Sequence, residues 1–405
     1  MKKKEIILLA STFILTSVVL YFFVFIYIFY VKGLQDIEII KNKNEIEFIE
    51  RYAKKLHHVR HYNNKYYKHN KVNELLFTEV QKHGSKKKFL FMGDSWFEQL
   101  IFYKNSSEEI NTYFNKKKID YINAAISSYS PTLITLQYKI LKNDFKLNPN
   151  YVVVYIDQTD FGDEVCRYKK NRYFNKKTGK LEGVKDIYFL PRTSAFYNIA
   201  NSSSHYLIKD FKMFNFFINE RFRLIKNKTS RILNKDLNIY GCHISKILNN
   251  LINPSNEEIL YFQDTIDLML DTLVEDANIK KILVVTFPHR NNLKEIKNFN
   301  ITRNRNNKET LKLDIFKKNK NSKNLVIKDF KINVADFVNS YIQKNNDKKI
   351  LHLDFTKNFN LGEVDITDKS YKAGDPASHL DTKDHLNTFT KSIIVEIDNI
   401  LKLHE

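Results

Sequence analysis

Residues 87–102 read KKFLFMGDSWFEQLIF, and this stretch contains the features that decide the fold. A short apolar run, 87–93, leads directly into Asp94 and Ser95 and then into an amphipathic helical pattern. Gly93 permits a tight turn, while aspartate and serine commonly begin helices. The stretch therefore predicts a buried strand, a tight turn and a helix, with Ser95 at the carboxyl edge of a sheet.

Four more apolar runs of the same character follow along the chain. They occupy 119–125, 150–156, 280–287 and 348–355, and helical patterns at 131–143, 256–276, 333–345 and 389–403 accompany them. Near-continuous apolar strands that alternate with helices are typical of a parallel sheet covered on both faces. We therefore predict an α/β fold, a three-layer α/β/α doubly wound parallel sheet. In such sheets the ligand binds beyond the carboxyl ends of the strands.

The composition is that of a folded chain. Among 405 residues, 43% are apolar and 14% aromatic, and 9 Gly and 6 Pro exclude collagen-like and proline-rich classes. Cys166 and Cys242 are too few for a disulfide-rich scaffold or a four-thiolate zinc site, and their pairing stays open. The sequence has no GxxxxGKS, no GxGxxG after a strand and no HExxH. We therefore expect no cofactor and no metal site.

The N-terminal segment predicts a membrane anchor. Residues 6–31 contain no charged side chain and are longer than the ~20 residues that a membrane-spanning helix needs. The bulky residues 22–30 do not suit a signal-peptide cleavage site. Three lysines at 2–4 precede the span, so the positive-inside rule leaves residues 1–5 in the cytoplasm and the rest outside. We expect a single-pass protein of a bacterial cell envelope.

Two regions differ in character from the strand-and-helix pattern. Residues 32–86 are strongly basic with helical periodicity and predict a stalk between the anchor and a domain at 87–405. The stalk histidines 57, 58 and 61 lack metal-ligand spacing, so a solvated face is expected for them. Residues 164–255 are long, aromatic and basic, and they predict an insertion with its own helices near the site.

Polar segments follow three predicted strands and recur before the last helix: GDS after the first strand, then NAAISSYS (123–130), DQTDF (157–161) and SHLDTKDHLN (378–387). With these segments the chain resembles the SGNH (GDSL) hydrolase family, over about 87–165 and 279–403. The resemblance implies a flavodoxin-like order of strands. It also implies that a serine in GDS forms an acyl-enzyme intermediate.

The resemblance assigns the oxyanion donors residue by residue. Ser95 matches the family nucleophile, and its backbone N–H is the first donor. Ser128 stands at the place of a family glycine, so a backbone N–H survives there although the glycine does not. Thr159 stands where the family has an asparagine amide; its hydroxyl can donate one hydrogen bond, and Gln158 is the alternative donor.

The resemblance also assigns the general base. His385, in the sequence His-Leu-Asn, matches the family histidine that accepts the serine proton. The usual acid position, three residues earlier, holds Thr382. Asp381 is the preferred carboxylate, Asp384 is the alternative, and a Ser-His dyad oriented by a backbone carbonyl is a third arrangement.

The predicted activity is that of a serine acyl-ester hydrolase or an O-acyltransferase. Water as acceptor gives an esterase and a sugar hydroxyl gives a transferase. The expected outward location and the basic surface predict an acylated, most simply acetylated, surface polysaccharide as the substrate. The alternative is a catalytically inert relative that binds an acidic glycan or a protein partner in glycan assembly. The formal charge of +20 also fits nucleic acid, but the expected outward location argues against it.

Two further residues are candidates for substrate binding. His289 follows the fourth predicted strand at the carboxyl edge, where it could contact a substrate carboxylate or simply form a turn. Trp96 follows the nucleophile and either lines the acyl pocket or packs in the core.

Overall fold

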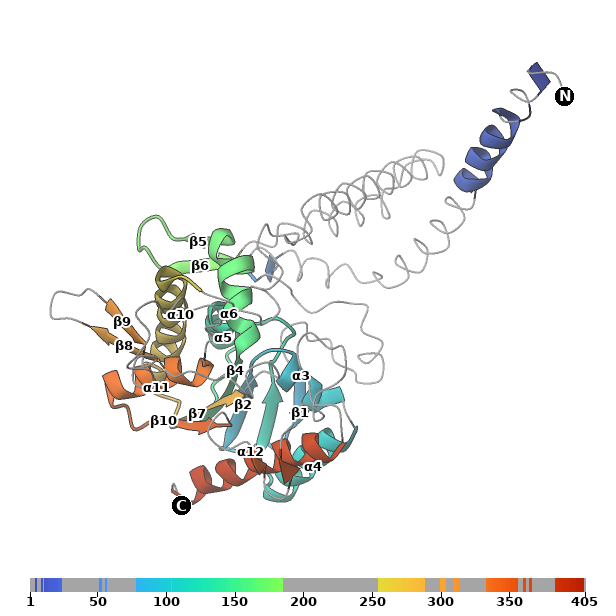
Figure 1. Cartoon of the computed structure of the whole chain (residues 1–405). Helices are drawn as coiled ribbons and strands as arrows, with labels where there is room; N and C mark the ends of the chain where they lie inside the picture. Colours follow the sequence, from blue (N-terminus) through green and yellow to red (C-terminus); the bar gives the residue numbers. More distant parts are fainter. Residues whose placement is uncertain are drawn as a thin grey trace. The chain divides into compact units, whose positions relative to one another are not determined.

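The computed structural model gives the chain as two compact units (Figure 1). One unit contains Met1–Arg51 and Tyr188–Thr229, and the other contains Tyr52–Ile187 and Ser230–Glu405. The residues that the structure describes are 4–5, 9, 11–23, 51–52, 55–56, 78–102, 104–184, 254–287, 299–303, 309–313, 333–355, 360–361, 364–365 and 383–403.

The second unit is built on a six-stranded sheet. Its strands are β1 (Thr78–Gln81), β2 (Lys88–Met92), β3 (Asp120–Asn123), β4 (Tyr151–Asp157), β7 (Lys281–Phe287) and β10 (Ile350–Asp354). Their order is β1-β3-β2-β4-β7-β10, and every pair is parallel except β1 with β3. The five parallel strands thus have the flavodoxin-like order 2-1-3-4-5, which confirms the predicted α/β class. β3 lies on one side of β2, and β4, β7 and β10 lie on the other, so the topological switch point is between β2 and β4. Such sheets bind ligands at this point.

Helices cover both faces of this sheet (Figure 1). The long helices are α3 (Ser95–Phe102), α4 (Lys104–Lys117), α5 (Pro131–Asn143), α10 (Asn256–Val274), α11 (Val334–Asn345) and α12 (Lys383–Lys402). α4 packs with α12 on one face, and α10 packs with α5 and α11 on the other. A capping box of Ser255 and Glu258 fixes the start of α10. The predicted alternation of strands and helices is therefore the observed one.

An aromatic core holds the sheet to α3, α4 and α12. The side chains of Phe89, Phe91 and Tyr155 are fully buried on this face, and Phe389 of α12 packs against Tyr155. All seven residues of β4 are buried, which explains why its sequence is continuously apolar instead of alternating. The buried strands give the loops at their carboxyl ends a rigid base.

The basic region 32–86 is not a helical stalk throughout. Tyr52 and Leu56 are buried, and Thr78–Gln81 is the strand β1 on the edge of the sheet. The helical periodicity does not reveal this strand, because an antiparallel edge strand depends on its partner, here β3, more than on its own periodicity. In the first unit, residues 11–23 form a helix. Among the described residues no helix has the length and hydropathy that crossing a membrane requires.

Smaller elements lie outside the main sheet. They are α6 (Gln158–Gly162), the π-helix η2 (Asp163–Tyr168), the 3-10 helix η3 (Lys169–Asn171), and the strand pairs β5 (Arg172–Phe174) with β6 (Leu181–Val184), β8 (Phe299–Arg303) with β9 (Glu309–Leu313), and β11 (Asn360–Leu361) with β12 (Val364–Asp365). η2 through β6 form the start of the predicted insertion, whose residues 185–253 lie outside the described part. Cys166 of η2 is disulfide-bonded. Cys242, the other cysteine of the sequence, also lies outside the described residues.

Candidate active site

Ser95 is the first residue of α3 and lies three residues after the end of β2. The turn between strand and helix depends on Gly93, which has φ = 150°. A Cβ at this position would lie 2.9 Å from Cβ and 3.2 Å from the carbonyl oxygen of Tyr155. Only glycine fits there, so the neighbouring strand β4 itself requires the Gly93 that precedes Asp94 and Ser95.

The loop that follows β3 carries Ser128 to the same edge of the sheet. The backbone N–H of Ala124 donates to the Phe91 carbonyl, and that of Ile126 donates to the Gly93 carbonyl, at 2.8 and 3.0 Å. Ser128 has φ = 66°, in the left-handed region. The residue therefore keeps the backbone conformation that glycine adopts freely, at a cost of about 1–2 kcal/mol for a side chain.

Side chains from two helices hold this loop. Glu98 of α3 accepts hydrogen bonds from the backbone N–H of Ser127, at 2.9 Å, and from its hydroxyl. On the η2 side, Arg167 Nη1 donates to Ser128 Oγ at 2.8 Å, and the Tyr168 hydroxyl donates to the Ser128 carbonyl. The loop is thus fixed from both directions around its strained residue.

Glu164 of η2 caps helix α5. Its Oε1 accepts from the Ser130 hydroxyl and from the Thr132 backbone N–H, both at 2.6 Å, and its Oε2 accepts from the Thr132 hydroxyl at 2.8 Å. Ser130 is the N-cap residue but makes no cap bond of its own, because its hydroxyl bonds Glu164 instead. A buried carboxylate at a helix N-terminus accepts from a free N–H and interacts favourably with the positive end of the helix dipole.

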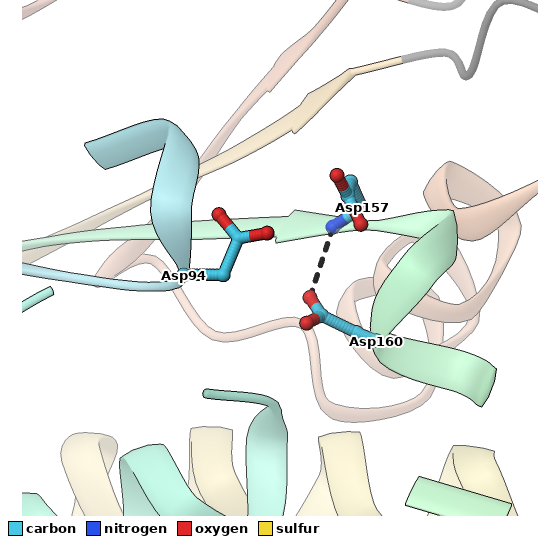
Figure 2. A group of neighbouring side chains, drawn as sticks. All are labelled: Asp94, Asp157 and Asp160. Atoms are coloured by element: carbon cyan, nitrogen blue, oxygen red, sulfur yellow. Dashed lines mark hydrogen bonds between the residues drawn. The ribbon is translucent and has the colours of Figure 1, made fainter. Parts of the chain in front are cut away.

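Three buried carboxyl groups meet beside the turn that carries Ser95 (Figure 2). Asp94 precedes Ser95, Asp157 ends β4 and Asp160 lies in α6; one oxygen of each lies within 4.8 Å of the others. Backbone N–H groups orient them: Trp96 donates to Asp94 at 2.8 Å, and Asp157 donates to Asp160 at 3.0 Å, the bond drawn in Figure 2. Asp160 Oδ1 has no hydrogen-bond partner among the described residues.

Burial raises the pKa of two of these acids, Asp94 and Asp160, and of the neighbouring Asp163. Burial raises the pKa of Asp94 well above its usual value, and the charge of Asp157 raises it further. Burial likewise raises the pKa of Asp160 strongly, with Asp157 and Asp94 adding to the rise. Burial also raises the pKa of Asp163 to about 7, although the Arg167 guanidinium, 3.0 Å from its Oδ1, opposes that rise. Carboxyl groups at such separations suit shared protons or a hard cation, and the raised pKa values favour shared protons.

The Thr159 hydroxyl, which the family resemblance assigns as an oxyanion donor, donates to a neighbouring carboxylate in this structure. Its hydroxyl donates to Asp157 Oδ1 at 2.6 Å, and its N–H donates to the same oxygen at 2.6 Å. Asp157 is the N-cap of α6, so its carboxylate accepts from the N–H of Thr159, two residues along the helix, and from the hydroxyl of the same residue. The alternative donor, Gln158, is buried.

The other expected triad members lie at the edge of the described part. α12 begins at Lys383, so Asp384 and His385 are in its first turn and not in a loop before it. Asp381 lies outside the described residues, as does His289. The assignment of the general base and its carboxylate therefore stays a prediction.

Trp96 is 1% exposed and belongs to the aromatic core. Its ring stacks on Tyr155 with centroids 5.5 Å apart and also contacts Phe287 and Phe389. Packing accounts for this side chain, which is the second of the two roles that the sequence left open.

Four residues that contact the loop with Ser127, Ser128 and Ser130 were not expected from the sequence: Glu98, Glu164, Arg167 and Tyr168. A signal was present, because the carboxylates at 157, 160, 163 and 164 continue at helical spacing beyond the third strand. Residues from 164 onward were instead assigned to an insertion, which separated these side chains from the site.

No protein-family model matches the sequence, and no curated protein matches it. Among solved structures, an acetyl xylan esterase, Est2A, from the rumen bacterium Butyrivibrio proteoclasticus is similar, with a TM-score of 0.34 and 10% sequence identity. The match covers 79% of this chain and 65% of that one, so it spans just under two thirds of the esterase. At this level the likeness carries no argument about the site, which rests on the residues described above.

Proposed function

We propose that this chain is a serine acyl-ester hydrolase or O-acyltransferase with Ser95 as its nucleophile. The observation that carries the proposal is the joint placement of Ser95 and Ser128. Ser95 begins α3 at the switch point of the sheet, and the Ile126–Gly93 hydrogen bond ties the Ser128 loop to the same turn. A nucleophile and a backbone N–H in the left-handed conformation on adjoining loops fit an oxyanion site.

The catalytic cycle follows from the needs of a serine hydroxyl. Ser95 Oγ attacks the ester carbonyl while His385 accepts its proton, and the N–H groups of Ser95 and Ser128 bind the oxyanion. The alcohol leaves with that proton, giving an acyl-Ser95 intermediate. Water then releases the acid, or a sugar hydroxyl accepts the acyl group. Asp381, or else Asp384, orients His385 in this scheme.

The substrate we propose is a short acyl ester, most simply acetyl, on a surface polysaccharide. Residues 6–31 would anchor the chain with the sheet domain outside the cytoplasm. In the described part of that segment, residues 11–23 are helical and expose apolar side chains such as Phe13 and Leu20. The disulfide at Cys166 also favours an oxidising compartment.

A fluorophosphonate probe tests the nucleophile directly. The chain in detergent should be labelled, and Ser95→Ala should not be, with p-nitrophenyl acetate turnover lost in parallel. Ser85→Ala, at a serine before β2, is the matched control and should keep both signals. The ratio of released acetate to acetyl transferred onto added oligosaccharide then separates hydrolase from transferase. Absence of labelling in a folded sample overturns the proposal.

One observation favours a second function, that of a catalytically inert glycan-binding or partner-binding protein. The Thr159 hydroxyl is used by Asp157, so the third oxyanion donor expected from the family resemblance is missing from its place. This alternative predicts that the fluorophosphonate probe does not label the parent protein. It also predicts that the parent protein and the Ser95→Ala variant bind an acidic oligosaccharide equally well.

A further inference from the structure

The direction of the Ser128 N–H depends on an unfavourable backbone conformation. At φ = 66° a residue with a side chain needs outside contacts to hold it, since extended and right-handed conformations cost less. A change of this angle would turn the N–H away from its present direction. The contacts that hold Ser128 therefore control the second oxyanion donor.

Two of these contacts come from consecutive residues of η2. The Tyr168 hydroxyl donates to the Ser128 carbonyl, and Arg167 Nη1 donates to Ser128 Oγ at 2.8 Å. They hold opposite ends of the residue, one on its backbone and one on its side chain. Together they hold the peptide group that follows Ser128 and the side chain on its Cα.

The two side chains are themselves fixed. Tyr168 is fully buried, and the Arg167 side chain is 22% exposed. Arg167 Nε lies 3.0 Å from Asp163 Oδ1, so one guanidinium bridges Asp163 and Ser128. Glu164 attaches the same short helix to the start of α5 through three hydrogen bonds. π-Helical turns such as η2 recur at functional sites.

We propose that Arg167 and Tyr168 are positioning residues that keep the Ser128 N–H directed at the oxyanion of the acyl transfer reaction. This inference rests on the proposed function, because the rate of acyl transfer at Ser95 would depend on these two side chains. η2 acts through Ser128 and does not touch the reacting atoms.

The first test compares Tyr168→Phe with Tyr113→Phe. Both remove one tyrosine hydroxyl bond, but Tyr113 is half-buried and bonds Asp398 on the α4–α12 face, away from the site. We expect Tyr168→Phe to lower kcat for p-nitrophenyl acetate and the rate of fluorophosphonate labelling about tenfold, with KM unchanged; full loss of an oxyanion donor costs about 10²–10³. Arg167→Lys, which cannot bridge two groups as a planar fork does, should have a smaller effect of the same kind. Tyr113→Phe should leave kcat unchanged.

A double-mutant cycle separates positioning from simple stability. Glycine adopts φ = 66° without cost, so the Ser128→Gly variant depends less on the contacts from Arg167 and Tyr168. Tyr168→Phe should therefore lower kcat less in the Ser128→Gly background than in the parent protein. Equal losses in both backgrounds, or a wild-type kcat in Tyr168→Phe, overturn the inference while labelling of Ser95 keeps the proposed function. Absence of Ser95 labelling in the parent protein overturns both.

Discussion

The backbone N–H of Ile126 donates to the carbonyl oxygen of Gly93 at 3.0 Å, which joins the loop after β3 to the turn after β2. This bond places the segment with Ser128 beside the segment with Ser95, although the two serines are 33 positions apart in the sequence. Gly93 itself lies against Tyr155 of β4, so three neighbouring strands meet at this point. The predictions below test the parts of that junction.

Gly93→Ala should destabilise the fold strongly. The new Cβ would lie 2.9 Å from the Cβ and 3.2 Å from the carbonyl oxygen of Tyr155, which is closer than almost all real Cβ contacts. In addition, φ = 150° is a conformation that alanine rarely adopts. We expect a loss of about 3 kcal/mol or more in the free energy of unfolding, measured with urea. Gly179→Ala is the control, because φ = 67° there comes with open space; it should cost about 1 kcal/mol. Similar losses in both variants would contradict the clash.

Asp163 should make stability depend on pH. Its pKa is about 7 in the folded chain, above the ordinary value of 3.8, so the folded state binds its proton more tightly than the unfolded state does. The stabilisation that the protonated Asp163 contributes is complete below about pH 4 and is lost as the pH rises toward 7. Between these two pKa values the free energy of unfolding should fall by at most about 1.4 kcal/mol for each pH unit. Relative to Asp163→Asn, the parent chain should lose stability across this window. A constant difference would show that the carboxyl titrates normally.

Asp160→Asn should be tolerated. Burial and the neighbouring carboxyl groups raise the pKa of Asp160 strongly, which favours the neutral acid, and asparagine has the same shape without the charge. The melting temperature at pH 7 should stay equal or rise, and added Ca²⁺ or Mg²⁺ should not change it in either protein. Asp120→Ala is the control, since Asp120 Oδ1 accepts the backbone N–H groups of His83 and Ser85; alanine removes this acceptor, and the melting temperature should fall. A cation-dependent rise that is present in the parent and absent in Asp160→Asn would instead assign the cluster to a metal ion.

Reduction of the Cys166 disulfide should weaken the η2 contacts. Cys166 lies between Glu164 and Arg167 and is 1% exposed. Removing a native disulfide costs about 2–5 kcal/mol, and here the lost constraint acts on the helix that holds Ser128. Cys166→Ser should lower both the melting temperature and kcat, and Cys242→Ser should match it, because the sequence has no third cysteine. A kcat that survives while the melting temperature falls would separate the disulfide from the site.

The five parallel strands and their helices were predictable because each carries its own local pattern. KFLFM and YVVVYID are apolar except for Lys88 and Asp157 at their ends, as is typical of strands buried on both faces. Helices α5 and α10 have clear starts at Pro131 and Ser255. β1 was missed because an edge strand of four residues has no such pattern and exists through its pairing with β3.

The sequence by itself determined the α/β class, the serine after the first strand and the polar segments after the next two strands. Tertiary structure alone decided how these segments are used. It kept Ser128 in the left-handed conformation, directed the Thr159 hydroxyl to Asp157, and buried Trp96 in the core. It also brought Arg167 and Tyr168 against Ser128, some 40 positions away along the chain. The physical reason is that strand and helix patterns are local, whereas hydrogen bonds, burial and raised pKa values depend on which distant groups the folded chain places in contact.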